Sequence, residues 1–163
     1  LSNIFGELFM LIEYDKRGIP LQLLYSDEKF YIPNNVYIIG MMNTADRSLA
    51  MLDYALRRRF AFFEFSPAFD TEGFRQYCQE KNNKKFDNLI AAIEKLNVAI
   101  ENDETLGRGF RIGHSYFCTE NSIDDMWLNA VITYEIIPLL NEYWFDEPSK
   151  VRDWEYALRE AIR

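Results

Sequence analysis

The sequence lacks the features of several common kinds of site. It has one histidine, His114, and two cysteines, Cys78 and Cys118, whose separation does not fit a zinc site. No apolar run approaches the roughly 18 residues that a membrane-spanning helix needs, and no signal peptide is recognisable. Free cysteines are typical of a reducing compartment. These absences predict a cytoplasmic protein with no metal site and no membrane contact.

Basic residues are also in the minority. The chain has 18 Lys and Arg against 26 Asp and Glu, which gives a formal net charge of −8. Binding to a phosphate backbone depends on clustered Lys and Arg, and the one compact basic cluster is the short run Arg57–Arg59. We therefore expect that these residues alone do not bind duplex DNA.

The elements that grip nucleotide phosphates are missing as well. There is no Gly-x-x-x-x-Gly-Lys-Ser/Thr loop, and no acidic pair follows an apolar strand in the way that holds Mg²⁺. The first residue is Leu1, and it opens an apolar pattern that reaches Tyr14. We interpret the 163 residues as a piece of a longer protein and expect no nucleotide to bind this piece alone.

What is present is organised around residues 36–65. Residues 36–42 form a nearly unbroken apolar run, which predicts a strand buried on both faces. The polar cluster Asn43–Ser48 follows, at the end of a strand where open α/β sheets bind ligands. An amphipathic helix then closes on Arg57–Arg59, and residues 60–65 predict a second strand. An ordinary strand–helix–strand unit with a solvated basic helix end is the alternative interpretation.

The flanks of this stretch predict further elements. A helix over residues 4–12 ends in a glycine signal at Gly18, and Pro20–Pro33 predicts a β-hairpin. After the break at Ser66–Asp70 the pattern becomes helical. The sequence thus predicts an α/β part over residues 1–66 and a helical part over residues 67–163.

The helical part contains two predicted long helices and a glycine-rich segment between them. Residues 86–100 carry apolar residues at helical spacing, and so do residues 124–145, where Pro138 should kink or split the helix. Between them, three glycines lie within seven residues of Gly107–Gly113, next to His114. Glycines at this density allow close backbone approach to a ligand or an unusual turn.

Three segments carry a family resemblance: MNTADRSLA from Met42, DYALRRRF from Asp53 and GFRIGHSYF from Gly109. Together they resemble the McrB family, the GTP-hydrolysing AAA+ subunits of methylation-dependent DNA restriction systems. The resemblance implies an α/β fold, with the C-terminal half of an AAA+ P-loop NTPase core followed by an α-helical lid domain.

The resemblance also implies roles for particular residues. Asn43, Thr44 and Asp46 lie in its sensor-1 region, where Asn43 would orient the attacking water and Thr44 would contact nucleotide. Asp46 would fix the loop, and Arg47 would compensate phosphate charge. Arg58 and Arg59 would act across a subunit interface on the neighbour's nucleotide. Gly113, His114 and Ser115 would lie near the nucleotide cleft.

The implied assembly is a homo-oligomer, hexameric in the family, that hydrolyses GTP or ATP with Mg²⁺ in the full-length protein. Its implied partner is an McrC-type endonuclease subunit, and DNA would be recognised by a separate N-terminal domain. Two alternatives stay open at this point: an ATP-driven remodelling chaperone of the MoxR type, and a protein-interaction module with no enzymatic role.

Overall fold

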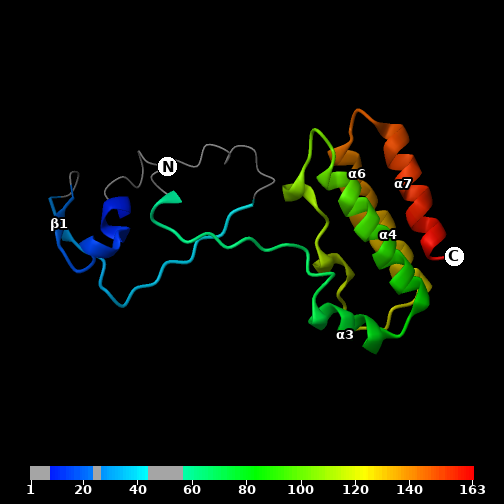
Figure 1. Ribbon diagram of the computed structural model, residues 1–163, viewed down its shortest axis with the longest axis horizontal. Helices are drawn as coiled ribbons and strands as arrows, with labels where there is room; N and C mark the ends of the chain where they lie inside the picture. The colour runs from blue at the N-terminus through cyan, green and yellow to red at the C-terminus, as the bar shows by residue number, and fades with distance from the viewer. Residues whose placement is uncertain (1–7, 24–26, 44–56) are drawn as a thin grey trace. The chain divides into compact units, whose positions relative to one another are not determined.

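The computed structural model describes residues 8–23, 27–43 and 57–163, and these belong to two compact units (Figure 1). Unit 1 is Leu1–Glu64 and unit 2 is Phe65–Arg163. Each unit is described by itself below. The predicted helix start near Ser2 and most of the predicted helix that leads to Arg57 lie outside the described residues.

Unit 1 contains a short helical stretch and a small antiparallel hairpin. Residues 8–12 are helical and are followed by the 3₁₀ turn η1, Tyr14–Lys16. Gly18 then adopts a φ of +76°, the left-handed conformation typical of a helix-ending glycine, but it lies six residues after the last α-helical residue, Ile12, and its N–H donates to the carbonyl of Ile32. The predicted hairpin is confirmed as β1, Leu21–Gln22, paired with β2, Lys29–Phe30.

The two predicted strands of the central stretch are not formed. Residues 36–43 have no regular secondary structure and are exposed, and the same holds for residues 61–65. A strand that is buried on both faces needs a hydrogen-bonded neighbour on each side. Among the described residues only β1 and β2 pair, and they pair with each other. The prediction of strands was therefore wrong for the described residues, because none of them lies beside these segments as a hydrogen-bonded neighbour strand.

Unit 2 begins with two helices joined by a tight polar turn. Thr71 caps α3, Glu72–Lys81, by accepting a hydrogen bond from the Phe74 amide. Asn82 is left-handed, with φ +45°, and Asn83 then caps α4, Lys84–Glu101. The turn reverses the chain so that α3 packs across one end of α4 (Figure 1).

The helix predicted over residues 124–145 is confirmed in broken form. It consists of α5, Asp125–Ala130, a π-helical turn η5, Val131–Ile136, and α6, Ile137–Tyr143. Pro138 has no amide hydrogen to donate, so the regular α-helical ladder cannot pass through it. The Ile137 amide bonds back to the carbonyl of Ile132, and this widened spacing defines the π turn.

The last helix, α7, spans Pro148–Ala161 and runs beside α4 and α6 (Figure 1). The three helices enclose a core whose largest buried side chains include Phe86, Ile93, Leu128 and Trp144. Asp103, just after α4, links the end of α6 to the start of α7. Its carboxylate accepts hydrogen bonds from Trp144 Nε1 at 2.8 Å and Lys150 Nζ at 2.7 Å.

Candidate functional site

The arginine run lies where a helix ends. Arg57 is the last helical residue, and Arg58 and Arg59 form a turn. In a helix, successive side chains point about 100° apart. A turn removes this constraint, so the directions of Arg58 and Arg59 are not fixed by helix geometry. Arg57 lies 5.9 Å from the centre of the Phe62 ring, in a cation–π contact, and Arg59 forms an ion pair with Glu13.

Arg58 differs from both neighbours. It is exposed, and within the described parts of the chain it makes no hydrogen bond or ion pair. Asn43, also exposed, stands at the end of the irregular segment 36–43. Thr44, Asp46 and Arg47, the other predicted residues of this region, lie outside the described residues. The structure therefore gives positions for Asn43, Arg58 and Arg59, all in unit 1.

The glycine-rich segment of unit 2 lies along α4 and is held there by a buried amide. Asn97 accepts a hydrogen bond from the Ile112 amide at 2.6 Å and donates to the Ile112 carbonyl at 2.9 Å. The Asn97 side-chain amide thus makes the two hydrogen bonds that the backbone of a neighbouring strand would make with Ile112. Gly107 precedes the short turn η3, Arg108–Phe110, with a φ of +86° that a residue with a side chain rarely adopts.

His114 opens a second 3₁₀ turn, η4, His114–Phe117, and is half-buried. Its Nδ1 accepts a hydrogen bond from the Ala68 amide at 3.1 Å. The imidazole also meets the rings of Phe69 and Phe74 edge to face. Gly113 and Ser115 flank His114 directly, so the three predicted residues form one continuous surface on unit 2, with Ser115 exposed.

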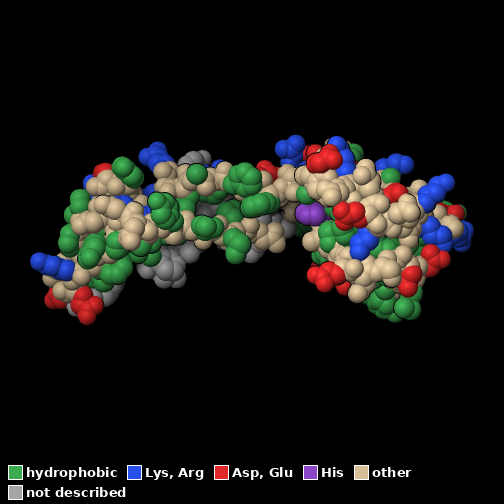
Figure 2. All heavy atoms as spheres, turned by 90° about the horizontal axis from the view of Figure 1, so that it is seen from below, with side chains coloured by type: hydrophobic (Ala, Val, Ile, Leu, Met, Phe, Trp, Pro, Cys, Tyr) green, Lys and Arg blue, Asp and Glu red, His purple; other side chains and the backbone are tan. Residues whose placement is uncertain are grey.

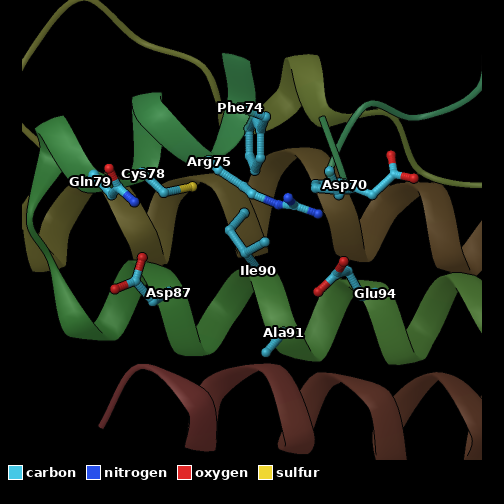
Figure 3. A pocket seen from close by; sticks show the side chains of 10 residues that line it. Asp70, Phe74, Arg75, Cys78, Gln79, Asp87, Ile90, Ala91 and Glu94 are labelled. Carbon is cyan, nitrogen blue, oxygen red and sulfur yellow. The ribbon is translucent and has the colours of Figure 1, made fainter. Parts of the chain in front are cut away.

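A groove of about 400 Å³ opens nearby, between α3 and α4 (Figure 3). Asp87 and Glu94 project from α4 toward α3, which supplies Arg75 and Cys78. Burial raises the pKa of the Cys78 thiol, and the Asp87 carboxylate raises it further. None of the predicted site residues lines this groove, although Phe74 belongs both to its wall and to the surroundings of His114.

None of the helices in the described ranges has the length and apolar content of a membrane-spanning segment. In the same ranges, no three side chains of His, Cys, Asp or Glu converge in a way that could hold a metal ion.

Sequence reasoning missed Asn97, which orders the glycine-rich segment. Asn97 lies four residues after Ile93 and three before Ile100, on the buried face of α4. A polar residue on an otherwise apolar helical stripe was the available signal, because a buried amide needs partners. The bond between Ala68 and His114, 46 residues apart, had no comparable signal in the sequence.

Comparison with known proteins covers most of the chain. Residues 1–60 match the family described as "AAA domain (dynein-related subfamily)", and residues 88–152 match "McrB, alpha-helical lid domain". The chain is 50% identical over 170 residues to the Type IV methyl-directed restriction enzyme EcoKMcrB subunit of Escherichia coli (strain K12). That alignment covers 97% of this chain and 37% of the relative. With an AAA portion followed by a lid portion, the chain belongs to the McrB family.

Proposed function

We propose that this chain is the sensor-1, arginine-finger and lid portion of a GTP-hydrolysing AAA+ motor subunit in a 5-methylcytosine-specific restriction complex. The observation that carries the proposal is Arg58, a cation on an exposed turn at a helix end with no partner among the described residues. The relative's description as a methyl-directed restriction enzyme subunit supports the biological setting. Because the chain spans 37% of that relative, the whole protein's activity and partners are part of the proposal.

The residues present fit one side of a nucleotide site and not the other. The sequence has no phosphate loop, so the cradle for the β and γ phosphates must come from other residues of a longer protein. Asn43 and Arg58 supply complementary groups. A neutral amide can orient a water molecule, and a guanidinium pairs with phosphate oxygens in two-point fashion. Bound GTP with Mg²⁺ would supply the phosphoanhydride bond that is cleaved; ATP is the alternative nucleotide.

Arg58 would act in trans, on the nucleotide of the neighbouring subunit. Positive charge placed where the transferred phosphoryl group gains negative charge lowers the barrier to hydrolysis. Arg59 is the second proposed finger, and within unit 1 it also forms an ion pair with Glu13. Arg47 and Asp46 complete the proposed set, with Arg47 compensating charge and Asp46 fixing the loop that carries Asn43 and Thr44.

The lid would cover the nucleotide with the surface formed by Gly113, His114 and Ser115. The exposed Ser115 hydroxyl and the half-buried His114 are polar groups that could face a ligand. Assembly into a ring, hexameric in the family, would bring Arg58 to the adjoining site. An McrC-type endonuclease subunit would cut the DNA, and a separate domain would recognise it.

The test is a mixing experiment in the longer protein. Asn43→Ala and Arg58→Ala should each lower turnover, with little change in nucleotide affinity, because each group acts mainly in the transition state. If Asn43 works in its own subunit and Arg58 in the next, mixed rings contain some interfaces with both groups intact. Those interfaces should restore hydrolysis that neither variant shows alone.

The size of the effect makes this restoration measurable. A trans-acting arginine is worth roughly a thousandfold or more in rate, so even a minority of intact interfaces should stand out. Arg57→Ala is the matched control, because Arg57 lies beside Arg58 but contacts the Phe62 ring. Mixed rings that assemble and remain as inactive as their components would refute the trans role of Arg58.

A further inference from the structure

The residues that join the two units are held by the lid. Unit 2 begins at Phe65, and residues 65–69, the connector, lead from there into the cap of α3. Two lid side chains that follow α4 in the sequence contact this connector. His114 Nδ1 accepts from the Ala68 amide at 3.1 Å, and Arg111 Nη2 donates to Ser66 Oγ at 3.3 Å.

The bond from the Ala68 amide determines which ring nitrogen of His114 remains available as a donor. A nitrogen that accepts an N–H bond cannot itself carry a proton, so the neutral ring of His114 bears its hydrogen on Nε2. The rings of Phe69 and Phe74, at centroid distances of 6.3 and 5.9 Å, hold the imidazole edge to face. Nδ1 is therefore committed to the connector, and Nε2–H is the donor left for a ligand.

The segment that carries His114 is itself anchored. Asn97 binds both polar backbone groups of Ile112, which is 1% exposed. Asn97 belongs to α4, the central helix of the lid core. A continuous series of contacts thus runs from α4 through Asn97 and the segment 111–114 to the backbone of Ala68.

We propose that His114 is a positioning residue that clamps the connector onto the lid, with Arg111 as its second contact. The connector then moves with the lid as one body, and any rotation of the lid relative to the AAA portion takes place at residues before Ser66. This inference rests on the proposed function for its link to turnover. It assigns His114 Nδ1 to the connector, where the family resemblance suggested only proximity to nucleotide.

Two substitutions distinguish the roles of the two ring nitrogens of His114. In His114→Asn, the side-chain oxygen lies about where Nδ1 was and can still accept from Ala68. In His114→Gln, the longer side chain places its amide about where Nε2 was and leaves the Ala68 amide without its acceptor. The two variants are similar in polarity and neither introduces a charge.

The first measurement is hydrogen exchange of the Ala68 amide by NMR in the 163-residue chain. Loss of one hydrogen bond of ordinary strength should speed local exchange by up to about tenfold. We expect protection of Ala68 in the native chain and in His114→Asn, and faster exchange in His114→Gln. The Ile93 amide, in the middle of α4, reports whether the lid core is intact in each variant.

The second measurement is nucleotide turnover by the longer protein carrying the same substitutions. A positioning role predicts that His114→Asn retains more turnover than His114→Gln, with the loss in kcat and little change in KM. If His114 acts only through a ligand contact at Nε2, the order is reversed and the loss is in KM, and this result would overturn the proposal. Equal turnover in both variants, with Ala68 exchange altered in one, would also overturn it.

The two measurements test the proposed function and the clamp independently. If the longer protein hydrolyses no nucleotide, the proposed function is wrong, and Ala68 exchange still tests the clamp. If Ala68 exchanges freely in the native chain, or equally fast in all three proteins, no clamp exists whatever the protein hydrolyses.

Discussion

Unit 1 and unit 2 come from one chain but differ in how many of their apolar side chains they bury. Unit 2 closes a core of 19 buried hydrophobic residues around α4. The described part of unit 1 buries Leu11, Ile12 and Ile32 in its own small cluster. Many of its other large apolar residues, including Tyr37, Ile39, Met41 and Phe63, are exposed, and hydrophobic side chains gather over this part of the chain (Figure 2).

The difference follows from the kind of secondary structure each unit needs. A helix satisfies its backbone within its own segment, so four helices can form a core from consecutive residues. A parallel strand needs neighbours that are distant in sequence. Residues 88–152 match the McrB lid family, whereas residues 36–43 present an apolar run without a sheet among the described residues.

The largest expected contrast is the effect of removing an apolar side chain. Ile93 is fully buried in α4, and Ile93→Ala should lower the free energy of unfolding of the lid by about 3 kcal/mol. Ile39 is 91% exposed in unit 1, and Ile39→Ala should change the same free energy of unfolding by less than about 0.5 kcal/mol. Urea unfolding followed by circular dichroism measures both. Equal losses would contradict the contrast between the units.

The second contrast is between a part-buried and an exposed ion pair. Asp103 has a side chain that is 7% exposed and bonds Lys150, so Asp103→Asn should cost about 2 kcal/mol at pH 7. Asp125, whose side chain is 68% exposed, pairs with Lys85, and Asp125→Asn should cost much less. The same unfolding measurement compares them, and a similar cost for both would show that Asp103 is not a structural centre of the lid.

The Asp103 interactions also predict a pH dependence. The hydrogen bond from Lys150, with further bonds from Thr105 and Trp144, lowers the pKa of the Asp103 carboxyl from its ordinary value of 3.8. A carboxyl whose pKa is lower in the folded state stabilises the fold above its unfolded pKa and loses that contribution as pH falls. The stability difference between the native chain and Asp103→Asn should therefore shrink below about pH 4. A difference that stays constant from pH 7 to pH 3 would contradict this.

The smallest expected effect concerns a helix cap. Thr71 accepts from the Phe74 amide at the start of α3, and Thr71→Ala should lower lid stability by about 1 kcal/mol. Thr71→Ser keeps the oxygen and is the matched control. Thermal unfolding detects the change, and equal destabilisation by Ser and Ala would mean that the cap bond contributes nothing.

Local signals allowed much of this structure to be predicted from the sequence. The hairpin formed within Pro20–Pro33 and Pro138 interrupted its helix, each through contacts within a few residues. The family resemblance, carried by three contiguous motifs, was confirmed by the comparisons.

What escaped prediction depends on distant residues. The segment 36–42 has the composition of a buried strand, but strand formation is decided by partners that composition does not reveal. The pairing of Asn97 with Ile112 and of His114 with Ala68 joins residues 15 and 46 positions apart. The roles of Asn43 and Arg58 stay predictions, because they concern a nucleotide and a neighbouring subunit.

The most direct test of the contrast between the units is hydrogen exchange of the amides of residues 36–42. In the 163-residue chain these amides have no strand partners among the described residues, and we predict rapid exchange beside slow exchange in α4. In the longer protein, where we propose that they join a sheet of the AAA core, exchange should slow by roughly a thousandfold or more, as in core strands. Rapid exchange of residues 36–42 in both proteins would contradict the assignment of unit 1 to half of an α/β core.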